Sequence, residues 1–268
     1  NIFNFFRLRK YIHRENIIFS QLLLTRHIKP VLKVFSFSVV TSIYLQLNTV
    51  LLGFLKNTLA VGYFAAATKV MQMLLTMSAC LGSVMMPRAS HLIAENKEDE
   101  FNRLIQKSYD FTLAIALPMT IGLIFCAPSL ITALCGVKFE HSILPSQIVA
   151  PIILMVAISN VFGIQVLFPK GKINIVTLCC GIGAVADLIL NLCLIPFFSY
   201  IGTSIAYLGA EVATTVSMYF IGRRYIPIIY FKKSHLTYAL GCIVMAFALY
   251  GISLLQLPTL TTLLVQGC

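Results

Sequence analysis

Long apolar stretches, separated by short polar gaps, run along almost the whole chain. Each stretch contains 22 to 28 residues, and a helix needs about 20 mainly apolar residues to cross the hydrocarbon core of a membrane. The pattern therefore predicts an all-α fold, a polytopic transmembrane bundle of about seven spanning helices. The predicted spans are Val31–Phe54, Leu59–Met86, Phe111–Leu134, Leu144–Phe168, Ile173–Pro196, Ile201–Gly222 and Leu236–Leu257.

Positive charge is concentrated in every second gap. Of the 20 Lys and Arg residues, 17 lie before or just inside the start of the first run or in and beside the second, fourth and sixth gaps between runs; Lys56 and Lys138 alone lie on the other side, and Lys69 lies inside the second run. Cytoplasmic loops carry the excess of Lys and Arg, so the N-terminus is expected in the cytoplasm and the seventh helix is expected to end outside. A heptahelical receptor, which begins outside, is therefore excluded. A retinal protein is excluded as well, because Leu236–Leu257 contains no lysine.

Composition agrees with a membrane location. The chain is 59% hydrophobic and 11% charged, whereas soluble domains carry about 25% charged residues. The net charge of +11 is explained by attraction of a basic face to anionic membrane lipids, so no nucleic-acid partner is expected. The eight cysteines show no metal-ligand spacing and are expected to pack as small apolar side chains; no metal site and no cofactor are predicted.

The domain organisation follows from these runs. We expect a basic cytoplasmic lead segment at 1–30, the helix bundle at 31–257 and the truncated start of a further helix at 258–268. Because the chain lacks an initiator Met and ends just after an apolar run begins, it is expected to be a fragment of a longer protein. A separate short helix with Asn96 as its N-cap is expected between the second and third spans.

Three ionisable residues lie deep inside predicted spans. A charged residue at a helix centre costs about 2.5–3.5 kcal/mol on insertion scales, so such residues normally face a bundle interior or a wet cavity. A rise of about 1.5 Å per residue places Lys69, Asp187 and Glu211 roughly 14–15 Å from the outer helix ends, in one layer. They either line a path for a charged solute or form a buried ion pair that fixes packing. For Asp187 the structural role is favoured, because Asn191 follows one turn later.

Polar stripes on three predicted helices favour an aqueous path. The first helix carries Gln46 and Asn48, the second continues Lys69 with Gln72, and the fourth carries Asn160 and Gln165. Polar side chains also join membrane helices by hydrogen bonds, so both interpretations remain open. The candidate residues of a substrate or ion pathway are Lys69, Glu211, Asp187, Asn48, Gln72, Gln46, Asn160 and Gln165.

Four segments, in this order, resemble the Wzx-type polysaccharide flippases of the multidrug/oligosaccharidyl-lipid/polysaccharide exporter superfamily. The first element covers the end of the first span and part of the second, the second element begins where the second span ends, and the last element joins the fifth and sixth spans. The segments are LNTVLLG at 47–53 with VGYFAAATK at 61–69, MPRAS at 86–90, GIQVLFPKG at 163–171, and NLCLIP at 191–196 with IGTSIA at 201–206 and Glu211.

The resemblance implies an architecture and an activity. Members of this superfamily have 12 to 14 helices in two lobes, so this chain would be the second lobe of a MATE-like transporter without its N-terminal lobe. The family is thought to flip undecaprenyl-pyrophosphate-linked oligosaccharide across the bacterial cytoplasmic membrane; other polysaccharide assembly proteins are candidate partners. Lys69 matches the family's basic cavity position and Glu211 its acidic one. Many relatives have Asp in place of Asn48, which weakens a proton-coupling role for this helix.

Two other functions remain open. One is a multidrug or cation antiporter of the same superfamily, and the other is a non-transporting membrane scaffold in which Lys69 and Glu211 only pack helices. An enzyme is not expected, because the chain has no Gly-rich phosphate loop and no HExxH motif, and its five histidines are scattered over loops and helix ends.

Overall fold

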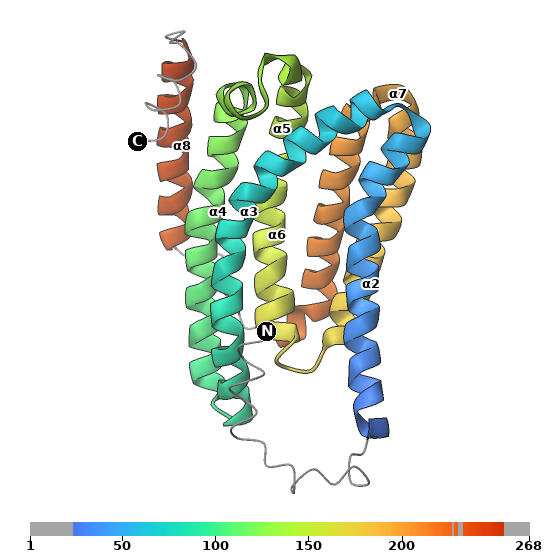
Figure 1. Cartoon of the computed structure of the whole chain (residues 1–268). Coiled ribbons are helices and arrows are strands. Elements are labelled where there is room, and N and C mark those ends of the chain that lie inside the picture. Colours follow the sequence, from blue (N-terminus) through green and yellow to red (C-terminus); the bar gives the residue numbers. More distant parts are fainter. Residues whose placement is uncertain (1–23, 227, 230–232, 255–268) are drawn as a thin grey trace, which may run out of the picture. The chain divides into compact units, whose positions relative to one another are not determined.

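The computed structural model of the chain describes residues 24–226, 228–229 and 233–254, and the regular elements among them are helices. Most of the predicted lead segment and all of the predicted truncated helix 258–268 lie outside these residues. The elements (Figure 1) are α2 (Leu24–Leu55), α3 (Thr58–Ala94), α4 (Glu98–Cys135), η3 (Val137–Ser142), α5 (Ile143–Val149), α6 (Ile152–Asn160), η4 (Val161–Leu167), α7 (Ile173–Gly222), η5 (Arg223–Tyr225) and α8 (Lys233–Leu254).

The chain divides into two units, 1–36 and 37–268, with the boundary inside α2. The described part of the first unit, residues 24–36, is helical and exposes large apolar side chains such as Val31 and Phe35. Exposed apolar side chains are expected on a helix surface that faces lipid rather than water. The contacts and pockets given below lie within residues 37–254.

The predicted spans coincide with described helices. Four segments are long and apolar enough to cross a membrane, and a pair of helices bent by 44°, Val137–Val149 and Ile152–Leu167, makes a fifth. The longest segment contains α7, which holds two of the predicted spans, and α8 contains a shorter apolar stretch, His235–Gly251. The all-α transmembrane bundle is thus confirmed, although the last predicted span is described only as far as Leu254.

The helix α7 breaks at Ser199, where the backbone has φ 50° and ψ −130°, and its two arms lie side by side (Figure 1). Gly183 on the first arm allows the close approach, because a Cβ there would meet the side chain of Thr214 and, at 3.3 Å, the carbonyl of Ala210. At Gly202 a Cβ would lie 2.6 Å from the carbonyl oxygen of Leu194. The tight fold-back of α7 therefore requires glycine at this position.

The prediction of a separate short helix before the third span is wrong. Residues from Glu98 onward belong to one continuous helix, α4, which ends at Cys135. The N-cap residue is Lys97, and Asn96 instead adopts a left-handed conformation with φ 56° in the turn after α3. Asparagine tolerates this conformation better than most residues, so the turn can be tight and α4 can extend beyond the membrane.

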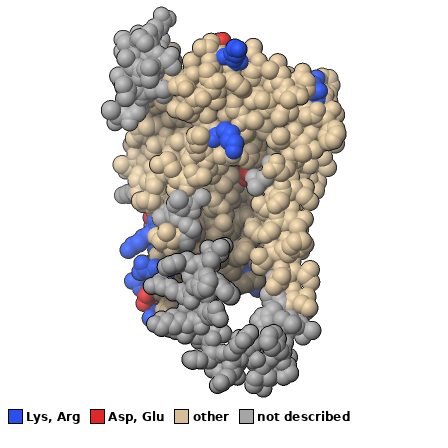
Figure 2. Space-filling model, viewed as in Figure 1, with Lys and Arg blue, Asp and Glu red and all other residues tan. Residues whose placement is uncertain are grey.

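Packing around α4 holds the bundle together. α4 contacts α3, α6 and α8, and its buried side chains Phe101, Ile105 and Leu123 are less than 2% exposed. α8 is joined to α4 by His235, whose Nε2 lies 2.9 Å from Oδ1 of Asp110. In Figure 2 the described surface in view is mostly uncharged, as a membrane-embedded face should be.

Candidate functional site

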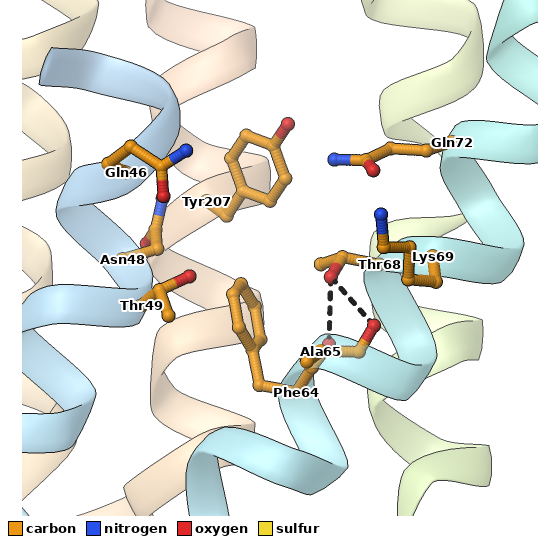
Figure 3. A pocket seen from close by; sticks show the side chains of 9 residues that line it. All are labelled: Gln46, Asn48, Thr49, Phe64, Ala65, Thr68, Lys69, Gln72 and Tyr207. Atoms are coloured by element: carbon orange, nitrogen blue, oxygen red, sulfur yellow. Dashed lines mark hydrogen bonds between the residues drawn. The ribbon is translucent and has the colours of Figure 1, made fainter. Parts of the chain in front are cut away.

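A polar pocket of about 200 Å³ opens between α2, α3 and α7. Its lining residues on α3 recur three and four positions apart, which places them on one face of that helix. Figure 3 shows the side chains of the three helices facing one another across this space. The lining residues are Gln46, Asn48 and Thr49 from α2, Phe64, Ala65, Thr68, Lys69 and Gln72 from α3, and Tyr207 from α7.

Lys69 supplies the positive charge of this pocket. Its side chain is exposed, and no described residue forms a hydrogen bond or an ion pair with its ammonium group. Its neighbour Thr68 is different, because its hydroxyl donates to the carbonyl oxygens of Phe64 at 3.0 Å and Ala65 at 3.2 Å (Figure 3). An ammonium without an internal partner, in the middle of a span, is available to an anionic group that enters the pocket.

Tyr207 faces Lys69 and Gln72 from the opposite wall (Figure 3). It is 7% exposed, and its ring meets the ring of Phe64 edge to face with 6.5 Å between centroids. Sequence reasoning did not select Tyr207. The signal was present, since Tyr207 lies four residues before Glu211 and therefore on the same face of α7.

A second pocket of about 220 Å³ lies next to the first. Glu211 and Asn160 line it, mostly among apolar side chains, and Glu211 is only 5% exposed. Both pockets share Gln72 and Tyr207. The predicted cation and one predicted carboxylate are thus brought to adjacent pockets, separated by these two side chains.

Asp187 lies in neither pocket but in a buried polar cluster between α2 and α7. The amide nitrogen Nδ2 of Asn191 donates to Oδ1 of Asn48 at 2.9 Å and to Oδ1 of Asp187 at 3.0 Å. All three side chains are at most 2% exposed. The link from Asp187 through Asn191 to another helix agrees with the packing role expected for this carboxylate.

Two oxygens of the cluster, Oδ2 of Asp187 and Oδ1 of Asn191, have no hydrogen-bond partner among the described residues. Carboxylate and amide oxygens are the ligand types of small hard cations, and a carboxylate can alternatively bind a proton. The cluster therefore has the chemistry to hold one small positive charge. No group of three His, Cys, Asp or Glu side chains with metal-binding geometry occurs in the described part of the chain.

Gln165 also lies apart from both pockets. It is 2% exposed, and its Oε1 accepts a hydrogen bond of 2.6 Å from the hydroxyl of Ser108 on α4. It belongs to η4, a π-helical segment. The contact joins two helices, so the geometry favours a packing role for this residue, and its place in a pathway stays a prediction.

An ion pair between Lys69 and a buried carboxylate, the alternative to a path for a charged solute, is not formed among the described side chains. Of the eight predicted pathway residues, Gln46, Asn48, Lys69 and Gln72 share one pocket. Gln72, Asn160 and Glu211 share the other.

Comparison with known proteins now identifies the family. Residues 10–144, half of the chain, match the family described as "Polysaccharide biosynthesis protein". The chain belongs to this family. The chain is also 26% identical over 180 residues to the "Putative O-antigen transporter" of Escherichia coli (strain K12), and 27% identical over 181 residues to the protein of the same description from Shigella dysenteriae. Each alignment covers 66% of this chain but only 42% and 44% of those relatives.

Solved structures with the same fold show what kind of helix bundle the chain forms. "Lipid II flippase MurJ, inward closed conformation" superposes with a TM-score of 0.75 at 16% identity and covers 98% of this chain and 56% of that one. A multidrug resistance MATE family transporter of the MOP superfamily, in an outward-facing conformation, superposes with a TM-score of 0.65 at 17% identity, over 82% of this chain and 53% of that chain. The chain therefore has the transporter helix-bundle fold of this superfamily and spans about half the length of these proteins.

Proposed function

We propose that the full-length protein is a flippase that moves undecaprenyl-pyrophosphate-linked oligosaccharide across the bacterial cytoplasmic membrane, and that this chain supplies its second lobe. The observation that carries the proposal is the ammonium of Lys69, which has no partner among the described residues and lies in a polar pocket of a membrane-spanning helix. A charged group without an internal partner is costly there, and an anionic solute that passes through the pocket offsets this cost during transport.

The neighbouring residues suit a glycan. Gln46, Gln72 and Thr49 offer amide and hydroxyl groups that both donate and accept hydrogen bonds, as sugar hydroxyls require. Phe64 and Tyr207 add aromatic faces, against which the apolar side of a sugar ring can pack. The two relatives that carry the description "Putative O-antigen transporter" support a substrate of this class.

Each lining residue has a role in this proposal. Lys69 meets an anionic group of the lipid-linked oligosaccharide, and Gln46 and Gln72 bind its sugars. Glu211 and Asn160 line the adjacent part of the path, and the Asn48–Asp187–Asn191 cluster holds a proton or cation that links transport to an ion gradient.

A multidrug or cation antiporter is the second candidate function. The observation that favours it is the likeness of the fold to MATE transporters together with the carboxylates of Asp187 and Glu211. The exposed cation in the first pocket opposes it, because an organic cation would be repelled by Lys69.

The deciding experiment is rescue of surface polysaccharide in a flippase-deficient bacterium that makes the same glycan. The full-length protein should restore the polysaccharide, and Lys69→Ala should reduce restoration at least tenfold at unchanged abundance in the membrane. Lys138→Ala, which removes an exposed lysine of η3 outside both pockets, is the matched control and should rescue fully. Full rescue by Lys69→Ala would reject the cavity role. Failure of the full-length protein to rescue, combined with drug export, would favour the antiporter.

A further inference from the structure

Three cations from two distant segments contact Tyr225, one at its backbone carbonyl and two at its ring. The side chain of Lys170 donates to the carbonyl oxygen of Tyr225 at 3.2 Å. Lys172 Nζ lies 5.1 Å from the centroid of the Tyr225 ring, and the guanidinium carbon of Arg224 lies 4.8 Å from the same centroid. Arg223 precedes Arg224 in η5. Gly171, with φ +70°, forms the tight turn between the two lysines.

No carboxylate of the described residues forms an ion pair with this cluster, although Lys170 lies 5.1 Å from the ring of Phe101, which follows the acidic first turn of α4. The first turn of α7, directly after Lys172, contains no acidic residue. The turn between α3 and α4 is different, because Lys97 lies 2.9 Å from Glu95 and that hydrogen bond lowers the pKa of the Glu95 carboxyl. Cation–π contacts with Tyr225 offset part of the repulsion, and an anion between the cations would offset the rest.

The position of the cluster favours an anion that belongs to the membrane. Because α7 folds back at Ser199, the start of its first arm and the end of its second arm lie at the same end of the bundle (Figure 1). The first arm, residues 173–198, is about 39 Å long at 1.5 Å per residue. This length exceeds the hydrocarbon core of about 30 Å, so the cluster lies at the depth of the lipid headgroups.

Exposed apolar side chains occur on both arms of α7 within about two helical turns of the cations. Phe220 is 60% exposed, and it precedes the exposed Arg224 by four residues, about one helical turn. Leu178 on the other arm is 55% exposed. A tyrosine between cations and an apolar surface is typical of the membrane interface. Acyl chains can therefore lie along Phe220 while their headgroup reaches Lys172 and Arg224.

We propose that Lys172, Arg224 and Tyr225 form a binding site for an anionic phospholipid, whose headgroup phosphate lies between the two cations. The phosphodiester accepts charge-assisted hydrogen bonds from the guanidinium and the ammonium. Lys170 holds the backbone of Tyr225 in place and so positions the ring that both cations contact. This site is separate from both pockets and does not depend on the transported substrate.

The test measures lipid retention by the purified full-length protein. Protein in detergent is mixed with phosphatidylglycerol or with phosphatidylcholine, and the bound lipid is counted by native mass spectrometry. We expect retention of phosphatidylglycerol but not of phosphatidylcholine. The double variant Lys172→Gln/Arg224→Gln should weaken retention at least tenfold. The matched control Arg103→Gln/Lys107→Gln removes the same charge from an exposed, acid-flanked part of α4 and should stay within twofold of the unmodified protein.

Two outcomes would overturn the proposal. Equal losses in the two double variants would show general charge attraction rather than a site. Competition by inorganic phosphate at the same concentration as the lipid would show a site for a free anion, in which the acyl chains contribute nothing. A Tyr225→Leu variant tests the ring separately, and its unfolding temperature shows whether any loss of lipid comes from unfolding. At an unchanged unfolding temperature this variant should lose lipid severalfold. Undiminished retention would contradict the role of the ring.

Discussion

Asn191 on α7 donates a hydrogen bond of 2.9 Å to Asn48 on α2, and the same amide group also donates to Asp187. Asn48 and Asn191 are 143 residues apart in the chain. The amide of Asn191 is therefore a polar link between α2 and α7.

Replacement of Asn191 by alanine should destabilise the protein. The substitution leaves Asn48 and Asp187 without their shared donor in a buried site, and an unsatisfied buried polar group costs about 1–3 kcal/mol. Thermal unfolding of the purified full-length protein in detergent measures the change. Asn174→Ala, at an exposed position of the same helix, is the control; equal unfolding temperatures for both variants would contradict the structural link.

Replacement of Gly202 by alanine should disrupt the fold-back of α7. The added Cβ would lie 2.6 Å from the backbone carbonyl of Leu194, and overpacking of this kind costs about 1–3 kcal/mol or more. Gly181→Ala is the matched control, because no atom lies within 4 Å of its Cβ and alanine is favoured over glycine in a helix by about 1 kcal/mol. The two variants should shift the unfolding temperature in opposite directions. A shift in the same direction would refute the close approach.

Tyr207 should matter to transport through its ring more than through its hydroxyl. Its ring packs against Phe64 and separates the two pockets, so Tyr207→Ala would join them and remove one wall of the site. We expect at least tenfold less surface polysaccharide with Tyr207→Ala and less than a threefold loss with Tyr207→Phe, at equal abundance. An equal loss in both variants would show that the hydroxyl carries the effect.

The charge distribution predicts which ends of the helices face outward, and labelling can test it. In a cysteine-free full-length protein, Lys138→Cys should react with a membrane-impermeant maleimide in intact cells, after removal of the outer membrane barrier. Lys97→Cys should react only when the cells are broken; both positions are exposed. The reverse pattern would invert the predicted orientation.

Sequence patterns were sufficient to locate the helices because membrane spans are defined by length and apolar content. The gap between Pro196 and Ile201 was enough to predict two spans where the structure has one broken helix, α7. The start of α4 was mispredicted because the acidic residues from Glu98 onward, after a possible N-cap, are typical of a separate surface helix. In the structure these residues form the first turn of α4 and continue directly into the span. Hydropathy marks where a helix enters lipid, but it does not mark where the helix begins.

The candidate site was only partly predictable for a geometric reason. Counting residues from a helix end gives the depth of Lys69, Asp187 and Glu211, but it does not give the direction in which each side chain points. The common depth of the three residues stays a prediction, and their side chains lie in a pocket, a buried cluster and a second pocket. Directions depend on helix packing, which one sequence does not contain.

The buried Asn48–Asp187–Asn191 cluster has a consequence for biogenesis. The α2 helix is synthesised and placed in the bilayer well before the ribosome reaches α7. When the first arm of α7 leaves the translocon, its carboxylate would face lipid at a cost of about 2.5–3.5 kcal/mol unless α2 is already there to cover it through Asn48. The α2 helix thus provides a polar contact for the first arm of α7 as that arm enters the membrane, and assembly of the bundle has a preferred order.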